Sequence, residues 1–324
     1  MERVFRKTPR LLNYILGEKR MKIAIVGIGG VGGYYGGLLA KQYSDDENVE
    51  IVFIARGDHL ERIKKNGLNL ITEKGTFTAR PDLAIDTPSG CGIFDCVIFC
   101  VKTYGLEESA KLLWPSIDEN TVVMSLLNGV DNADRLRAVL NKGNIYNGCV
   151  YIGAHIVRPG VVQQAGSLNK LFFGNESNDK IEANHIENIL KEANIDAQYR
   201  TDIENIVWEK YVLISAFATA TTFLGKTMRG IIDSQKGKKL LDDLLTEVLR
   251  VSEAKQIELP KNIRKEIIAK VSAFPPEMKT SMQMDFEKGN PTEIETFTGY
   301  IVREAGRYGL SAPTYERIYG ALKK

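Results

Sequence analysis

The sequence has few of the features that would place it in a specialised class of protein. Its 324 residues include 4 cysteines and 3 histidines, and 43 Lys and Arg balance 41 Asp and Glu. This near-neutral charge is atypical of proteins that bind nucleic acid by neutralising phosphates. The longest apolar stretch, Val212 to Gly225, contains hydroxyl residues and falls short of the roughly 20 residues that a membrane span needs. We therefore expect a soluble protein without nucleic-acid or membrane partners.

The cysteines and histidines also lack the spacing of a metal site. No two C-x-x-C pairs of the zinc-binding type occur. Cys96 and Cys100 lie in an apolar run that reads as a buried strand, where thiols act as small hydrophobes; a redox or metal role is the alternative. We expect a reducing, cytoplasmic compartment and no bound metal. The three histidines are isolated, and we assign His59 to the surface with no chemical role.

The length suggests two domains, at roughly 150 residues each. Residues 1–20 are rich in Arg and Lys and have no apolar core of a secretory signal. An organellar presequence is one interpretation of this N-terminal extension. Because a strand pattern begins immediately at Met21, we favour a mis-set start or a dispensable arm, and we leave the segment out of the fold prediction.

The remaining chain changes character near residue 200. From 21 to 200, apolar runs at 22–26, 50–54, 96–101 and 121–127 alternate with helical patterns, which predicts a Rossmann-type doubly wound parallel sheet. Shorter pieces between 146 and 174 suggest a hairpin at the sheet edge. From 201 to 324 the pattern is helical, with helices expected over 203–224, 240–249, 294–308 and 314–323. The predicted fold class is α/β, with an all-helical C-terminal domain.

A glycine-rich loop follows the first predicted strand and opens a helix. It has the pattern G-x-G-x-x-G and consists of Gly27, Ile28, Gly29, Gly30, Val31 and Gly32. Glycines at these positions permit a tight turn, a close approach to a pyrophosphate and close packing of the helix on the strand. In this strand–turn–helix context the loop predicts a dinucleotide site; a turn without ligand is the alternative.

The end of the second predicted strand indicates which dinucleotide is bound. A site for NAD carries Asp or Glu there to hold the ribose 2′-hydroxyl. This chain has Ala55, Arg56 and Gly57 instead. A guanidinium pairs with a 2′-phosphate, whereas a carboxylate repels it, so Arg56 favours NADP(H). The alternative is an ordinary surface arginine.

Three polar residues are candidates for the chemistry. Lys102 and Asn128 follow two predicted strands, at the edge of the sheet where ligands of such folds bind. Lys210 lies on the apolar face of the predicted helix 203–224. A lysine in that setting either extends to water or serves a site, and desolvation generally prepares a lysine to donate a proton near neutral pH.

From Met21 onward, the chain resembles the ketopantoate reductases (2-dehydropantoate 2-reductases). The resemblance is carried by the glycine loop and by several short motifs in the same order. These motifs are Val101-Lys102-Thr103, Asn128-Gly129-Val130, Trp208-Glu209-Lys210, Ser281-Met282-Gln283-Met284-Asp285 and Pro291-Thr292-Glu293-Ile294-Glu295. The last two are far more specific than the glycine loop.

The resemblance implies a role for each matching position. Lys210 corresponds to the general acid that protonates the keto oxygen, and Glu293 to an acidic residue that binds substrate and positions the lysine. Ser281 corresponds to a substrate-contacting serine; without the resemblance, Ser281 and Glu293 would be taken as ordinary helix-start residues. Lys102 and Asn128 correspond to residues of the cleft that contact both cofactor and substrate.

The implied activity is NADPH-dependent reduction of 2-dehydropantoate to (R)-pantoate, on the route to pantothenate and coenzyme A. The implied partners are a small 2-oxo acid and, in a family of monomers and dimers, a possible second copy. Typical members carry asparagines four and eight residues after the lysine, where this chain has Ile214 and Ala218. Ser215 and Thr219, one step around the helix, are partial substitutes.

This departure leaves other functions open. One alternative is a reductase of a less polar 2-oxo acid, and another is an opine-type dehydrogenase of the same architecture. A non-catalytic NADP-binding protein is a third, but retention of the proton donor argues against it.

Overall fold

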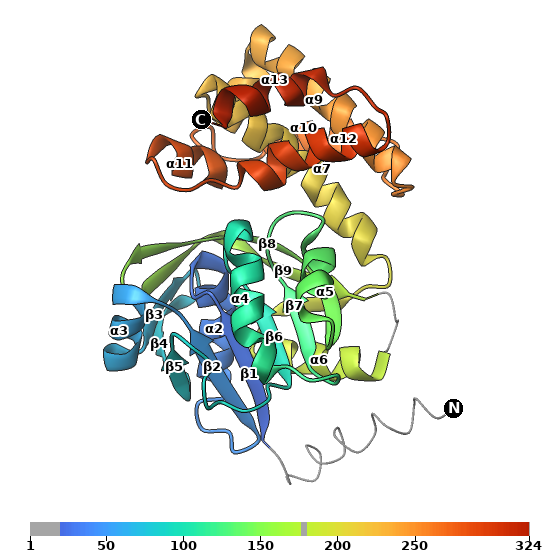
Figure 1. Ribbon diagram of the computed structural model, residues 1–324. Helices are drawn as coiled ribbons and strands as arrows, with labels where there is room; N and C mark the ends of the chain where they lie inside the picture. Colours follow the sequence, from blue (N-terminus) through green and yellow to red (C-terminus); the bar gives the residue numbers. More distant parts are fainter. Residues whose placement is uncertain (1–19, 176–179, 324) are drawn as a thin grey trace. The chain divides into compact units, whose positions relative to one another are not determined.

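The structure is a computed structural model that describes residues 20–175 and 180–323 (Figure 1). Apart from Arg20, the predicted N-terminal extension lies outside the described residues. The chain divides into two compact units. Unit 1 comprises the described residues up to Leu127 together with Asp131–Ile203, and unit 2 comprises Asn128–Val130 and the chain from Glu204 onward.

A ten-stranded sheet forms the centre of unit 1, in the order β4-β3-β9-β8-β7-β6-β1-β2-β5, with β10 paired to β9. Its strands are β1 (Met21–Val26), β2 (Val49–Ile54), β3 (Leu68–Thr72), β4 (Gly75–Ala79), β5 (Leu83–Ile85), β6 (Cys96–Phe99), β7 (Val122–Ser125), β8 (Asn144–Arg158), β9 (Val161–Gly174) and β10 (Asp196–Tyr199). The strands from β5 to β8 in this order are all parallel. The predicted strands at 22–26, 50–54, 96–101 and 121–127 are β1, β2, β6 and β7.

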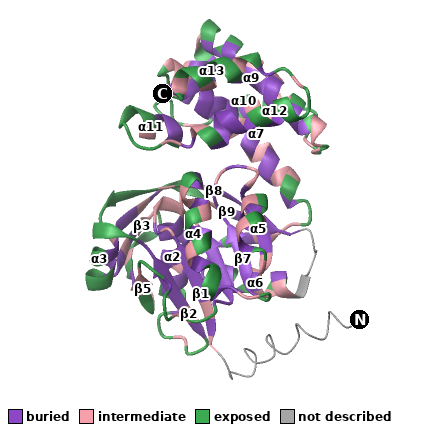
Figure 2. Ribbon diagram, viewed as in Figure 1, coloured by how far each residue is buried: buried purple, intermediate pink, exposed green. Residues whose placement is uncertain are grey.

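Helices cover both faces of this sheet, as the continuous apolar strands predict. The helices are α2 (Gly30–Gln42), α3 (Gly57–Asn66), α4 (Leu106–Leu113), α5 (Asn132–Leu140) and α6 (Lys180–Glu192). In β1, Ile23 and Ile25 belong to one buried cluster, whereas Ala24 and Val26 belong to another. Figure 2 shows the central strands as buried. The predicted doubly wound α/β architecture is confirmed, in a sheet that is mixed rather than wholly parallel.

The predicted edge hairpin is wrong in its position. β8 and β9 are long antiparallel strands inside the sheet, between β7 and β3. The hairpin of β3 and β4 lies beyond them because β3 pairs in parallel with β9. The apparent breaks in the sequence correspond to a turn at Gly160, where φ is +79°, and to two register shifts in the β8–β9 ladder.

Among the described residues of unit 2, all regular secondary structure is helical. Its elements are α7 (Ile203–Leu224), α8 (Met228–Asp233), α9 (Gln235–Ala254), α10 (Ile263–Ser272), α11 (Ser281–Glu287), a π-helical turn η3 (Glu295–Gly299), α12 (Tyr300–Arg307) and α13 (Pro313–Leu322). The all-helical prediction is confirmed, although η3 interrupts the single helix expected over 294–308. Trp208, Tyr211 and Tyr300 pack edge to face or tilted in the core.

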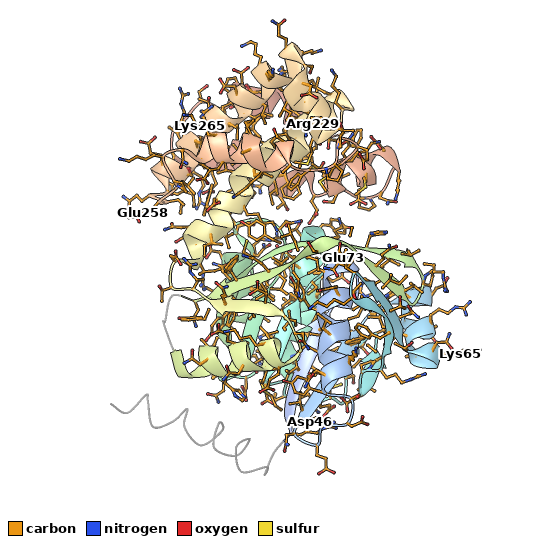
Figure 3. The ribbon with its side chains drawn as sticks, turned by 180° about the vertical axis from the view of Figure 1, so that it is seen from behind. Asp46, Lys65, Glu73, Arg229, Glu258 and Lys265 are labelled. Carbon is orange, nitrogen blue, oxygen red and sulfur yellow. The ribbon has the colours of Figure 1, made fainter. Side chains whose placement is uncertain are left out.

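Acidic and basic side chains are interspersed on the outer surfaces of both units. Figure 3 labels Asp46, Lys65, Glu73, Arg229, Glu258 and Lys265 as examples. No helix among the described residues is long and apolar enough to cross a membrane. The long apolar segment at 212–225 belongs to α7 as far as Leu224, and the residues of this helix from Tyr211 to Thr222 are mostly buried.

Candidate active site

The glycine loop joins β1 to α2, and the space around its glycines differs sharply. Gly27 has a φ of +90°, and a Cβ there would lie 2.9 Å from the backbone nitrogen of Val101. A Cβ on Gly30 would lie 2.0 Å from the carbonyl oxygen of Ala154, and one on Gly32 would lie 2.0 Å from that of Gly27. These three positions therefore require glycine, because a side chain would overlap backbone atoms.

Gly29 is the exception, because a Cβ there would meet no atom within 4 Å. It stands at the N-cap of α2, where no side chain caps the helix and the first turn has no acidic residue. Open space, backbone N–H groups and the positive end of the helix dipole together form an anion site. The loop therefore fits the pyrophosphate of a dinucleotide, which its sequence predicts.

Arg56 directly precedes α3, two residues after the end of β2. Its side chain is 63% exposed, and its Nη2 donates a hydrogen bond to Oε1 of Glu108 over 3.1 Å. The guanidinium thus lies at the carboxyl edge of the sheet. Its present partner is a weakly held surface carboxylate, which a phosphate group can replace.

The prediction that His59 lies on the surface needs correction. Its ring is half-buried, and Nδ1 accepts a hydrogen bond from the backbone N–H of Gly160 at the β8–β9 turn, over 3.1 Å. Burial lowers the pKa of His59, against an opposing effect of the Ile28 backbone in the glycine loop. The sequence gives no sign of this because Gly160 lies 101 residues away.

Lys102 follows β6 at the start of a short 3₁₀ turn, Thr103–Gly105. Arg135 of α5 braces this turn, since its Nη2 donates to the carbonyl oxygen of Thr103 over 2.6 Å. The same guanidinium forms a bidentate pair with Glu107, at 2.7 and 2.8 Å. This hydrogen bonding to Arg135 holds the pKa of the Glu107 carboxyl below its ordinary value. The segment that carries Lys102 is therefore fixed by an ion pair.

The predicted catalytic residue Lys210 and the predicted binding residue Asn128 come together in unit 2. Nζ of Lys210 donates a hydrogen bond to Oδ1 of Asn128 over 2.7 Å, although 82 residues separate them. Residues 128–130, which follow β7, belong by their contacts to unit 2 and not to the sheet. An amide oxygen orients the ammonium without neutralising it, so the group remains able to donate a proton.

Ser281 and Glu293 belong to segments that border α7. Ser281 is the exposed first residue of α11, and the N-cap of that helix, Thr280, shares a hydrogen bond of 2.9 Å with Thr221 of α7. Glu293 is only 4% exposed and directly precedes the helical segment that contains η3. Its carbonyl oxygen accepts hydrogen bonds from the N–H groups of Thr296 and Phe297, at 3.1 and 3.0 Å.

The hydroxyls expected to replace the missing asparagines lie elsewhere. Ser215 donates to the carbonyl oxygen of Phe297 over 2.6 Å, and Thr219 bonds to Thr298 over 2.9 Å. Both residues are fully buried in the core of unit 2. Four and eight residues after Lys210, α7 has the partly buried Ile214 and the buried Ala218, so neither position offers a polar side chain. The expectation that Ser215 and Thr219 act as substitutes is therefore wrong.

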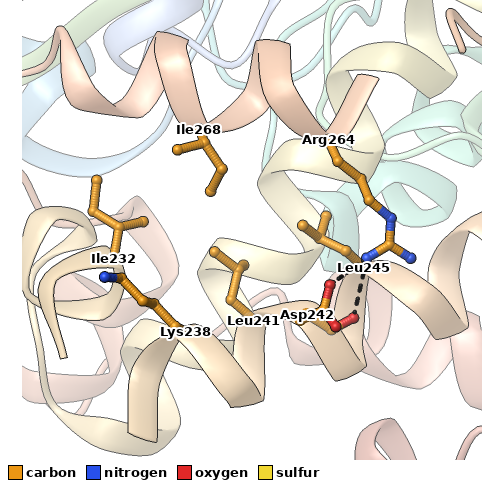
Figure 4. A pocket seen from close by; sticks show the side chains of 7 residues that line it. All are labelled: Ile232, Lys238, Leu241, Asp242, Leu245, Arg264 and Ile268. Carbon is orange, nitrogen blue, oxygen red and sulfur yellow. Dashed lines mark hydrogen bonds and ion pairs between the residues drawn. The ribbon is translucent and has the colours of Figure 1, made fainter. Parts of the chain in front are cut away.

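A separate hollow in unit 2, of about 250 Å³, lies among α8, α9 and α10. Figure 4 shows Ile232, Leu241 and Ile268 around it, with an ion pair between Arg264 and Asp242 at one side. None of the predicted site residues lines it. This hollow is therefore distinct from the candidate active site.

A dinucleotide loop on a doubly wound sheet, joined to a helical unit that carries a lysine, defines an oxidoreductase of the two-unit, nucleotide-dependent class. Residues 23–178 match the family described as ketopantoate reductase PanE/ApbA, and residues 202–324 match the C-terminal part of the same family. The chain therefore belongs to the ketopantoate reductase family.

Individual relatives agree with this assignment. An uncharacterized oxidoreductase of Bacillus subtilis, YkpB, is 28% identical over 304 residues, which cover 94% of this chain and 98% of the relative. The crystal structure of 2-dehydropantoate 2-reductase from Porphyromonas gingivalis is 33% identical, with a TM-score of 0.82 over 94% of this chain and 100% of that one. A D-mandelate dehydrogenase solved with NADH and anilino(oxo)acetate shares the fold, at 24% identity and a TM-score of 0.83, over 94% and 97% of the two chains.

Proposed function

We propose that the protein reduces a 2-oxo acid to the 2-hydroxy acid with NADPH, and that 2-dehydropantoate is the first candidate substrate, giving (R)-pantoate for pantothenate and coenzyme A synthesis. The observation that carries this proposal is the hydrogen bond between Lys210 and Asn128, in a chain of this family. Membership of the family supports reduction of a 2-oxo acid in general. The substrate, the cofactor and the residue roles are our proposals.

Lys210 supplies the acid chemistry in this proposal. When bound, NADPH supplies a hydride to C2 of the substrate, and negative charge develops on the keto oxygen. The Lys210 ammonium stabilises that charge and transfers its proton to the oxygen, which yields the 2-hydroxy acid. Solvent then returns a proton to Nζ. Asn128 orients the ammonium. Glu293 binds the substrate and helps to position Lys210, and Ser281 binds the substrate.

The cofactor choice rests on Arg56 and the glycine loop. Gly27, Gly29, Gly32 and the start of α2 would hold the pyrophosphate, and Arg56 would pair with the 2′-phosphate. We assign Lys102 to contacts with both cofactor and substrate. Replacing Arg56 with Asp should reverse the preference from NADPH to NADH; a variant that still prefers NADPH would exclude this role.

A second candidate is a 2-oxo acid with an apolar side chain. It is favoured by Ile214 and Ala218 and by the inward direction of Ser215 and Thr219. An unpaired buried polar group costs about 1–3 kcal/mol, so a hydroxylated substrate that met only Ile214 and Ala218 would lose affinity. The apolar competitor would lose none.

One assay separates these candidates. The purified protein is given NADPH or NADH with 2-dehydropantoate, and then with aliphatic and aromatic 2-oxo acids, with and without amines. Turnover of 2-dehydropantoate above all others supports the first candidate, and preference for an apolar acid supports the second. Turnover that requires an amine indicates an opine-type reaction. No oxidation of either cofactor with any acid would refute the proposed function.

We further propose that the protein works in the cytoplasm. Burial raises the pKa of the Cys96 and Cys100 thiols and keeps them protonated, and neither is joined in a disulfide. A homodimer remains part of the proposal, and light scattering of the purified protein tests it.

A further inference from the structure

The helix that follows Glu293 begins with the π-helical turn η3, Glu295–Gly299. The N–H of Tyr300 bonds to the carbonyl oxygen of Glu295, five residues back. Such turns are rare, occur as single turns within α-helices and are frequent at functional sites. Since η3 begins two residues after Glu293, whatever fixes η3 also fixes that residue.

Hydroxyl groups of α7 hold the buried side of η3. The Tyr211 hydroxyl donates to the carbonyl oxygen of Thr296 over 2.7 Å, and the Ser215 hydroxyl donates to that of Phe297 over 2.6 Å. All four residues are buried. The backbone N–H groups of the same two residues, Thr296 and Phe297, donate to the carbonyl oxygen of Glu293. A short chain of hydrogen bonds therefore leads from α7 to Glu293.

Charged and polar groups hold the exposed side of the same turn. The Glu295 carboxylate accepts from Nη1 of Arg303 over 2.8 Å and from the Tyr319 hydroxyl over 2.6 Å, and it pairs with Lys323 at 3.0 Å. A Cβ on Gly299 would lie 2.8 Å from Oε2 of Glu295, so a side chain there would disturb this cluster. The turn is fixed from both sides.

We infer that Tyr211 and Ser215 are positioning residues that set Glu293 relative to Lys210 for proton transfer. Tyr211 directly follows Lys210 on α7, so one helix carries the proposed acid and the hydroxyls that fix the turn after Glu293. This inference rests on the proposed function, and it adds a role for hydroxyls that contact neither substrate nor cofactor.

The test compares Tyr211→Phe and Ser215→Ala with a matched control, Ser252→Ala. Ser252 is also buried in unit 2 and donates to a backbone carbonyl, that of Leu249, over 2.8 Å, but it lies in α9 outside the proposed site. The measurements are kcat, KM and the pH profile of kcat for the 2-oxo acid turned over fastest, together with Tm and the Kd of NADPH.

We expect kcat and kcat/KM to fall together by about tenfold in Tyr211→Phe and Ser215→Ala, with the alkaline limb of the kcat profile displaced. The Kd of NADPH should not change, because the glycine loop belongs to unit 1. The Tm of Ser252→Ala should fall about as much as that of the two test variants, while its kcat stays at the wild-type value. Wild-type kcat and an unmoved pH profile in both test variants would overturn the inference.

The design separates this inference from the proposed function. If the wild-type protein fails to oxidise NADPH with every 2-oxo acid tested, the proposed function itself is refuted. An active wild type with unaffected variants refutes only the positioning role. Should Ser215→Ala not fold, Tyr211→Phe decides alone, since phenylalanine keeps the ring packing with Trp208 and Tyr300.

Discussion

Two alanine substitutions in the glycine loop should affect different properties, because Gly32 is tightly packed and Gly29 faces open space. Gly32→Ala would place a Cβ 2.0 Å from the carbonyl oxygen of Gly27 and 2.9 Å from Cβ of Cys100. Gly29→Ala would place its Cβ where no atom of the protein lies within 4 Å. We expect the first change to damage the fold and the second to damage cofactor binding alone.

The magnitudes follow from the local geometry. Overpacking against backbone costs about 1–3 kcal/mol or more, so Gly32→Ala should lower Tm by about 2–4 °C for each kcal/mol lost. Gly29 has φ −83° and ψ −151°, an extended conformation outside the left-handed region that favours glycine. Since the new Cβ also meets no atom within 4 Å, Gly29→Ala should leave Tm close to that of the wild type.

The affinity for NADPH should fall in Gly29→Ala, although its stability is preserved. The new methyl group of Gly29→Ala occupies the space through which a phosphate reaches the start of α2. Hydrogen bonds to charged groups contribute about 1.5–3 kcal/mol, so the Kd of NADPH should rise about 10- to 150-fold. Fluorescence titration with NADPH and thermal unfolding measure the two effects. Wild-type NADPH affinity in Gly29→Ala would refute our placement of the pyrophosphate.

Three further changes test other parts of the site. Glu108→Gln should release Arg56 and tighten NADPH binding about two- to fivefold without affecting NADH, because exposed ion pairs contribute about 0.2–1 kcal/mol; equal gains for both cofactors would contradict this. Ile214→Asn should raise kcat/KM for 2-dehydropantoate relative to an apolar 2-oxo acid, and an unchanged ratio would exclude a role in specificity. The pKa of His59 is lower in the folded protein than in the unfolded chain, so the unfolded chain takes up this proton more readily. The free energy of unfolding should therefore be highest above pH ~6.5, the ordinary histidine value, and should decrease as the pH falls below it. The free energy of unfolding of His59→Asn should depend less on pH over that range than that of the wild type. Identical pH profiles of the two proteins would argue against a lowered pKa at His59.

Local patterns in the sequence predict the parts of the fold that depend on neighbouring residues. The strand at 22–26 and its glycine loop follow from one continuous segment, and α7 coincides with the predicted helix over 203–224. The position of β8 and β9 does not follow from such patterns, because it depends on the pairing of β3 with β9 across about 90 residues of chain. The π-helical turn has no local signal either, since α7 supplies the hydroxyls that hold it.

In the candidate site, too, local sequence selects individual residues but does not show how they contact one another. The end of a predicted strand points to Asn128, the apolar face of a predicted helix points to Lys210, and the motif resemblance supports both. Their hydrogen bond joins distant parts of the chain and becomes visible only in three dimensions. Similarly, the hydroxyls of Ser215 and Thr219 look available in a helical projection. Only the structure shows that the core of unit 2 uses both of them.

The rate of hydride transfer in Lys210→Ala tests the central claim most directly. A single turnover of bound NADPH with the preferred 2-oxo acid, followed by the loss of NADPH, isolates the chemical step from substrate binding and product release. Removal of a general acid should slow this step about 10²- to 10⁴-fold while the Kd of NADPH stays at its wild-type value. A Lys210→Ala variant that oxidises NADPH at the wild-type rate would contradict the account.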